Sequence, residues 1–353
     1  MDDRSFVAGQ AFILAAKNYW TREIYPALEA DYRDRAAVQD APVEVPDQVA
    51  ALIGDTTLYR YYGWLERHLQ RFKYSGRYGL QPYHDERREA LRQRLPTDLP
   101  AGLLELDPEL KIPDSFTAFD IHQHPGGVWS DEIAGFVYER GARTTTPLAG
   151  QTHRDLHQRL ADCIAEDGIP DRLLDMGCGF GKSTRPFWET FRDAEIHAVD
   201  ISAPCLEVAA MDAADVQARN VRYRQMSAAA TDYPDADFDL VTSTMLIHEM
   251  PPSEIEAVLD EAQRVLAPGG RMVHLDFLPA DDAFSRFIHF GHARRNNEPY
   301  MEPLARTDLP TLLRDRGFID IEIEPFEEAE GSLDSAYPNW RFPWVTITAR
   351  RGD

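Results

Sequence analysis

Residues 172–184 read RLLDMGCGFGKST, and this stretch decides the fold that we predict for the chain. Leu173 and Leu174 form a short apolar run, which predicts the end of a buried strand. Glycines then alternate with other residues, and the next segment, TRPFWETF (184–191), is typical of a helix. A strand, a glycine turn and a helix in this order predict the opening of a doubly wound α/β domain, where ligands bind at the carboxyl ends of the strands.

Two common phosphate-binding loops do not fit the spacing of these glycines. A P-loop would require glycine at the position of Met176, because Gly181 precedes the Lys-Ser pair, and Gly177 comes one residue too late. The dinucleotide fingerprint requires a third glycine three positions after the second, whereas Gly181 follows Gly179 by two. An NAD-dependent oxidoreductase is therefore disfavoured. The turn alone leaves open that it binds nothing.

The pattern from Asp175 to Gly181 is Asp-x-Gly-x-Gly-x-Gly, and it resembles the first motif of class I S-adenosylmethionine-dependent methyltransferases. Three later segments follow in the order of that family's strands: AEIHAVDIS (194–202), FDLVTSTMLIHEM (238–250) and EAQRVLAPGGRMVHLDF (261–277). Together they resemble the methyltransferase core over about residues 150–350. The resemblance implies an α/β fold with a doubly wound, seven-stranded, Rossmann-like core that ends in an inserted antiparallel strand.

The same resemblance implies S-adenosylmethionine as cofactor and S-adenosylhomocysteine as product. Asp175 is then expected to accept from the methionine amino group, Asp200 to hold the ribose hydroxyls, and Ile201 to lie against the adenine. Family members often carry an aspartate where this chain has Ser227, and the uncharged serine weakens that contact. The residues expected at the cofactor are Asp175, Gly177, Cys178, Gly179, Gly181, Asp200, Ile201, Ser227, Ala228 and Thr244.

The segment after the strand that starts at Phe238 is where the resemblance places the acceptor. His248 is the candidate general base, because an imidazole with a near-neutral pKa suits deprotonation of a hydroxyl. Glu249 is predicted to orient or polarise it. A histidine that only braces the loop explains His248 equally well. His274 and Asp276 are weaker candidates of the same kind.

Two segments near the N-terminus, residues 5–35 and 47–75, carry apolar residues at helical spacing. We therefore predict an N-terminal, mainly α-helical domain over 1–118, a lid or linker over 119–150, and the methyltransferase core over 151–353.

Aromatic residues run from Tyr59 to Trp64 within this helical part. They have two interpretations, a packing seam between helices, which is favoured, and the lining of an acceptor pocket. The aromatic, helical pattern also suggests a homodimer through these helices.

An insert over 279–303 interrupts the core and is rich in aromatic and cationic residues. It is predicted either as a lid that grips an acidic or aromatic acceptor or as a flap that packs its apolar side inward; arginines suit a carboxylate or phosphate. His122 and His124 lack a partner acid or cysteine at metal-ligand spacing, so no metal is predicted. The residues expected at the substrate are Tyr138, Met245, His289, Arg294 and Arg295.

The net charge of −23 argues against nucleic-acid binding through a general basic surface and against docking on anionic membranes. No apolar run approaches the roughly 18 residues of a membrane span, and three scattered cysteines predict neither a disulfide framework nor a zinc site. We expect a cytoplasmic protein.

These observations predict a methyltransferase that acts on a small organic acceptor, with methylation on oxygen favoured. Methylation on carbon or nitrogen is the nearest alternative. An alternative of another class is a regulatory or scaffolding subunit that binds the cofactor without catalysis.

Overall fold

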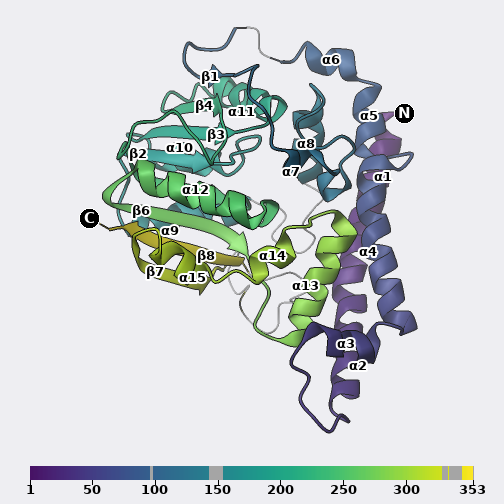
Figure 1. Cartoon of the computed structure of the whole chain (residues 1–353). Coiled ribbons are helices and arrows are strands. Elements are labelled where there is room, and N and C mark those ends of the chain that lie inside the picture. The colour runs from purple at the N-terminus through teal and green to yellow at the C-terminus, as the bar shows by residue number, and fades with distance from the viewer. Residues whose placement is uncertain (96–97, 143–153, 328–332, 334–343, 353) are drawn as a thin grey trace.

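The computed structural model describes residues 1–95, 98–142, 154–327, 333 and 344–352. A single eight-stranded sheet with the order β1-β4-β3-β2-β5-β6-β8-β7 forms the centre of the core (Figure 1). β8 runs antiparallel to both of its neighbours, β6 and β7, and every other pair of strands in the sheet is parallel. The strands are β1 (Leu104–Glu105), β2 (Arg172–Met176), β3 (Glu195–Asp200), β4 (Val221–Gln225), β5 (Phe238–Thr244), β6 (Leu266–Phe277), β7 (Phe318–Pro325) and β8 (Trp344–Arg351).

The strand order confirms the predicted doubly wound fold. The chain extends the sheet from β2 through β3 to β4 on one side and then returns to place β5 and β6 on the other. The order therefore reverses next to β2, which is where such sheets bind ligands. Strands β2 to β8 are the seven expected strands, and β8 is the inserted antiparallel one. The short β1, which lies in the part predicted as mainly α-helical, adds an eighth strand by pairing with β4.

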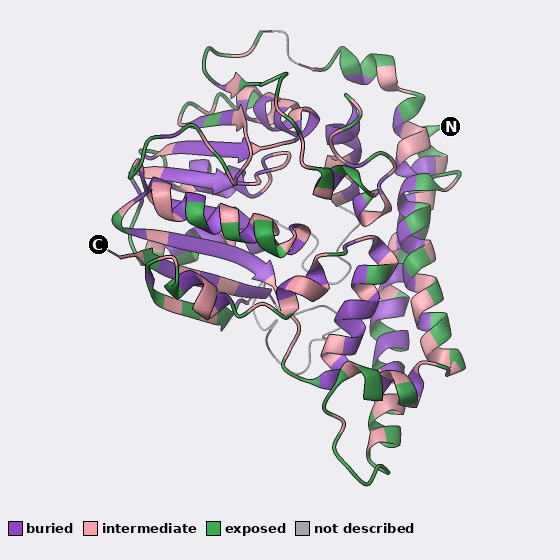
Figure 2. Ribbon diagram, in the orientation of Figure 1, coloured by how far each residue is buried: buried purple, intermediate pink, exposed green. Residues whose placement is uncertain are grey.

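Helices cover both faces of this sheet, because successive strand residues point to opposite sides. Leu173 packs in a hydrophobic cluster with residues of three helices on one face, whereas Leu174 packs against two helices on the other. The strands are accordingly buried while the outer helix surfaces are exposed (Figure 2). The first face carries α9 (Arg154–Glu166), α10 (Thr184–Thr190) and α11 (Ala203–Asp215), and the second carries α12 (Pro252–Val265) and α15 (Leu309–Arg314).

The N-terminal part is helical, as predicted. Pro26 stands in the first turn of α2, and a π-helical segment precedes it, so the first helical segment is divided there. The helices are α1 (Asp3–Tyr19), η1 (Trp20–Ile24), α2 (Tyr25–Ala36), α3 (Pro46–Ile53), α4 (Thr57–Ser75), α5 (Leu80–Asp85) and α6 (Arg88–Arg92).

The insert folds into α13 (Ala283–Asn296) and α14 (Met301–Ala305), and α13 lies against α3 and α4 (Figure 1). Its apolar residues, Phe284, Phe287 and Ile288, share one hydrophobic cluster with the N-terminal helices. This arrangement matches the interpretation of the insert as a flap that packs its apolar side inward.

The aromatic run of α4 also packs rather than lining a pocket. Tyr62 is buried and stacks on Trp20 with ring centroids 4.8 Å apart, whereas Tyr61 and Trp64 are exposed. The homodimer stays a prediction, since one chain does not test it.

Between the helical part and the core lie α7 (Asp114–Thr117), η2 (Ile121–Gln123) and α8 (Ala134–Ala142). Residues 143–150 of the predicted lid and 151–153 of the predicted core fall outside the described residues, and the domain division stays a prediction. Within the described chain, no helix is both long and apolar enough to cross a membrane.

Candidate active site

A cavity of about 320 Å³ lies between the carboxyl ends of β2, β3 and β5 and the N-terminal helices. The core side is lined by the glycine turn, Asp200 and Thr244, which end or follow those strands. The helical side is lined by residues of α1, η1 and α4, among them Trp20 and Leu69. The topology of the sheet thus places the cavity at the edge predicted for ligand binding.

The glycine turn presents its backbone to the cavity. Gly179 has φ +52°, and a Cβ built there would find no atom nearer than Tyr138 Cε1 at 3.9 Å, so a ligand can approach the main chain closely at this point. Gly181 serves packing instead, because a Cβ there would stand 2.9 Å from that of Ala209 on α11. Gly177, Cys178 and Gly179 line the cavity, whereas Gly181 does not.

Asp200 fixes this turn and faces the cavity. Its two carboxylate oxygens accept from the N–H groups of Gly179 and Ser202, both at 2.8 Å. Burial raises the pKa of Asp200 to about 6, against the lowering effect of these hydrogen bonds. An ionised Asp200 retains lone pairs for two hydroxyl donors, which fits the predicted ribose contact.

Asp175 occupies a different place from the one predicted. Its side chain is fully buried behind the turn and accepts from the hydroxyls of Thr184 (2.7 Å) and Ser183 (3.3 Å), so it braces the start of α10. Burial raises the pKa of Asp175 to about 7. Neither Asp175 nor Gly181 lines the cavity; both support the turn from behind, and their predicted contact with the cofactor stays a prediction.

The remaining residues expected at the cofactor, Ile201, Ser227, Ala228 and Thr244, all line the cavity. The Ser227 hydroxyl accepts from the N–H of Ala229 at 3.2 Å. The Thr244 Oγ1 is buried and has no hydrogen-bond partner among the described residues. An open backbone at Gly179, a carboxylate at Asp200 and this free hydroxyl fit a nucleoside that carries further polar groups.

His248 lies in η3 (Ile247–Glu249), lines the cavity and forms a dyad with Asp276 at the end of β6. The His248 Nδ1 is 2.6 Å from Asp276 Oδ1, and Asp276 also accepts from the backbone N–H groups of Ile247 (3.0 Å) and Phe277 (2.8 Å). Burial alone would lower the pKa of His248, but the carboxylates of Asp276, Glu249 and Glu298 outweigh it and raise the pKa above 6.5. With Nδ1–H donated to Asp276, Nε2 is the atom that can accept a proton.

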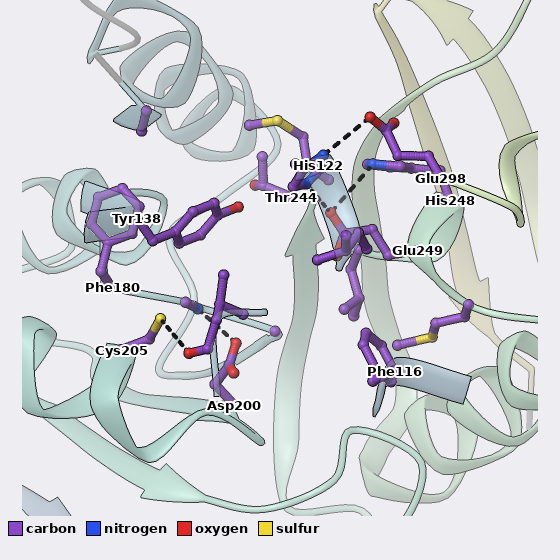
Figure 3. A pocket seen from close by; sticks show the side chains of 18 of the residues that line it. Phe116, His122, Tyr138, Phe180, Asp200, Cys205, Thr244, His248, Glu249 and Glu298 are labelled. Atoms are coloured by element: carbon purple, nitrogen blue, oxygen red, sulfur yellow. Dashed lines mark hydrogen bonds and ion pairs between the residues drawn. The ribbon is translucent and has the colours of Figure 1, made fainter. Parts of the chain in front are cut away.

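Glu249, the second predicted catalytic residue, belongs to a chain of acids and imidazoles that are buried or half-buried (Figure 3). Its Oε1 lies 3.7 Å from His248 Nε2 and 2.8 Å from Nε2 of His122, whose Nδ1 lies 3.1 Å from Oε1 of Glu298. His122 and Glu298 were not predicted at the site. His122 belongs to the predicted lid, but its partner acids stand 127 and 176 residues away in the sequence, so no local spacing connects them.

Backbone strain gathers at the same place. His122 (φ 53°) and Gln123 (φ 58°) before the core and Met245 (φ 56°) after β5 all adopt left-handed conformations that are unfavourable for their side chains. Strained residues of this kind persist only where the surrounding structure holds them, and they cluster at functional sites.

Of the residues predicted at the substrate, Tyr138 and Met245 line the cavity. His289, Arg294 and Arg295 do not line it, as far as the described residues define it, and their contact with a substrate stays a prediction. The Arg295 Nε pairs with Glu66 inside the helical part, and Arg294 pairs with Glu302 at the surface. His289 is buried, and its pKa falls to about 3 through burial, although it bonds the backbone of Met301.

Three or more His, Cys, Asp or Glu side chains arranged to hold a metal ion do not occur in the described part of the chain. The His122 ring nitrogens are instead engaged by Glu249 and Glu298.

Replacing Glu298 by Gln (E298Q) is expected to lower the free energy of unfolding by about 3 kcal/mol near pH 5.5, because it leaves half-buried His122 with only one of its two carboxylate partners. His122 and His292 outweigh burial and lower the pKa of Glu298 from 4.5 to about 2, so its contribution is lost as the pH falls through that range. Glu298 and Glu249 outweigh burial at His122 and raise its pKa from 6.5 to about 10, so the contribution is also lost as the pH rises between those values.

The measurement is urea-induced unfolding of both proteins at pH values inside and outside this window. Glu302→Gln is the matched control, since Glu302 pairs with Arg294 and Arg306 at the surface and its loss should cost less than about 1 kcal/mol. Equal effects of E298Q near pH 5.5 and near pH 10 would contradict the ion pair.

Comparison with known proteins agrees with this geometry. Residues 173–270 match the model of a methyltransferase domain family. The 27-O-demethylrifamycin SV methyltransferase of Amycolatopsis mediterranei is 32% identical over 216 residues, which cover 61% of this chain and 71% of that protein. The demethylmenaquinone methyltransferase of Thermus thermophilus is 34% identical over 122 residues, 35% of this chain, and the match spans only about half (54%) of that relative's length.

A solved structure of phosphoethanolamine N-methyltransferase 2 from Haemonchus contortus, in complex with phosphomonomethylethanolamine and S-adenosylhomocysteine, is similar in fold. It is 19% identical, has a TM-score of 0.46 and covers 63% of this chain and 58% of its own.

Proposed function

Because the chain belongs to the class I S-adenosylmethionine-dependent methyltransferases, we propose that it transfers a methyl group from S-adenosylmethionine to an oxygen of a small organic acceptor. The cofactor, when bound, supplies an electrophilic methyl group. The residues that would hold it are the Gly177–Gly179 backbone, Asp200, Ile201 and Thr244.

The observation that carries the proposal of O-methylation is the His248–Asp276 dyad at the cavity wall. An acceptor hydroxyl becomes a good nucleophile only when its proton is removed. Asp276 holds His248 in the tautomer whose Nε2 is unprotonated, and the surrounding carboxylates strengthen this base. The name of the Amycolatopsis relative, 27-O-demethylrifamycin SV methyltransferase, refers to a substrate that lacks a methyl group on oxygen, and this supports the same choice.

The cavity walls favour an aromatic or acidic acceptor. Trp20, Phe116 and Trp129 supply flat apolar surface, which suits a ring. Lys17 and Lys73 line the same cavity, and burial lowers the pKa of Lys17 to about 8 and that of Lys73 well below 10.5. A negative group on the acceptor would stabilise the charged form of both lysines. These two residues take the role that the sequence suggested for Arg294 and Arg295.

Methylation on carbon or nitrogen is the second candidate, since the same dyad can take a proton from an acidic C–H or from N–H. The alternative outside catalysis, a subunit that only binds the cofactor, gives no reason for a buried base at the cavity.

The test is formation of S-adenosylhomocysteine from S-adenosylmethionine with a panel of aromatic acceptors that differ in one group: hydroxyl, amine, or methyl ether of the hydroxyl, each with and without a carboxylate. We expect turnover with hydroxyl compounds and none with their methyl ethers. Turnover restricted to amines would mean that the methylated atom is nitrogen and not oxygen. Binding of S-adenosylhomocysteine without turnover of any acceptor would favour the non-catalytic alternative.

A further inference from the structure

Among the residues that the segment before the core places in the cavity wall is His122, which lies beside Glu249 and Glu298. The left-handed backbone there is held from two sides. Gln70 on α4 donates to the His122 carbonyl at 2.9 Å, and Gln123 donates to the carbonyl of Arg295 on α13 at 2.8 Å. The imidazole is therefore placed by helices that belong neither to its own segment nor to the sheet.

This imidazole connects two carboxylates that come from different parts of the chain (Figure 3). Glu249 belongs to η3 at the end of the core strand, and Glu298 follows α13 of the insert. His122 lies 2.8 Å from the first and 3.1 Å from the second. Without a cation between them the carboxylates of buried Glu298 and half-buried Glu249 would repel each other, since little water is present to screen them.

We propose that His122 is a positioning residue, which acts by holding the Glu249 carboxylate beside Nε2 of His248. The proposal rests on the proposed function, because it concerns the base of that reaction. At 3.7 Å, Glu249 Oε1 is too far from Nε2 for a hydrogen bond, so Nε2 keeps its lone pair for the acceptor. The carboxylate is still close enough to stabilise the imidazolium that forms when His248 takes the proton.

The step that His122 serves is a single proton transfer. The acceptor O–H bond breaks and leaves its electron pair on oxygen, and an N–H bond forms at Nε2 of His248. The negative charge of Glu249 offsets the new positive charge on the ring, and His122 keeps Glu249 from moving away.

Several charged or titratable groups face His248, and they determine how its titration should respond. They are Asp276 from β6, Glu249 from η3, Glu298 after α13, and His289 from α13. If His122 contributed only its own positive charge, its removal would raise the pKa of His248. If His122 positions Glu249, its removal releases that carboxylate and lowers the pKa of His248. The two roles therefore predict opposite signs.

The experiment is a pH titration of the His248 ring by NMR in the full chain labelled at histidine, with H248Q used to assign the signal. We expect Glu249→Gln to lower the midpoint by about one pH unit or more. His122→Gln should also lower the His248 midpoint, and the double variant with both replacements should show little further change. An unchanged or raised midpoint in H122Q would overturn the proposal, as would additive effects in the double variant.

His124→Gln is the matched control. His124 is a buried histidine two residues away that stacks on Tyr74 and does not line the cavity, so its replacement should leave the His248 midpoint within about 0.3 pH units. His122→Asn provides a second variant if H122Q does not fold, as judged by far-UV circular dichroism. The titration needs neither acceptor nor cofactor, so it decides the role of His122 even if no acceptor is methylated. A failure to methylate any acceptor would count against the proposed function and not against the role of His122.

Discussion

Replacing His248 by Gln (H248Q) is expected to lower the turnover number about 10²- to 10⁴-fold, the range that a positioned general base contributes. Binding of S-adenosylhomocysteine should stay within about threefold of the wild type, because His248 is not among the residues expected at the cofactor. The wild-type rate should rise with pH along a limb whose midpoint lies above 6.5, since His248 accepts a proton only when neutral and its pKa is raised. Formation of S-adenosylhomocysteine with the best acceptor of the panel measures the turnover number and its dependence on pH.

His274→Gln is the control for this experiment. Like His248, His274 is a buried histidine, but it belongs to β6 and does not line the cavity. Its Nδ1 lies 2.6 Å from the Ser243 hydroxyl. Burial lowers the pKa of His274 to about 4, so it is neutral throughout the working range. Wild-type turnover in H248Q would remove His248 from the mechanism and leave it as a residue that braces the loop.

The sequence predicted the cofactor half of the site more accurately than the acceptor half, and the reason is locality. The glycine turn is a continuous segment, and Asp200 follows it within one strand–helix–strand unit, so spacing alone relates them. The spacing does not predict in which direction a side chain points. Asp175 has the expected position in the chain, but its side chain points behind the turn toward Thr184.

The acceptor half is built from contacts between distant segments, and no sequence period connects them. Lys17, His122 and Glu298 line one cavity, and Glu298 is brought there by α13, which packs its phenylalanines in a cluster with α4. The arginines of the insert looked like ligands because the chain is otherwise so acidic, yet Arg295 was already matched by Glu66 on α4. A cation is thus available to a ligand only if the fold leaves it without a partner acid, and that depends on tertiary structure.

Replacing Asp200 by Asn (D200N) is expected to weaken binding of S-adenosylhomocysteine roughly 100-fold, about 3 kcal/mol. The carboxylate accepts from two backbone N–H groups of the turn and is predicted to accept from two ribose hydroxyls as well. An amide offers one oxygen, so its NH₂ group would face a donor, and an unsatisfied buried donor costs about 1 to 3 kcal/mol in addition to the lost charge-assisted bonds. Isothermal titration of wild type and variant measures the difference, with NAD as a ligand that we expect not to bind.

The pH dependence of the same titration separates this role from a loss of folding in the variant. Burial raises the pKa of Asp200 to about 6, so in the free wild-type protein the carboxyl becomes protonated as the pH falls through that value. A protonated carboxyl is a weaker acceptor, and affinity should therefore decline below about pH 6 in the wild type but not in D200N. Asp193→Asn, an exposed aspartate before β3, should bind as the wild type does at every pH. Equal affinity of D200N and wild type would mean that Asp200 only shapes the turn and that the ribose is held by other groups.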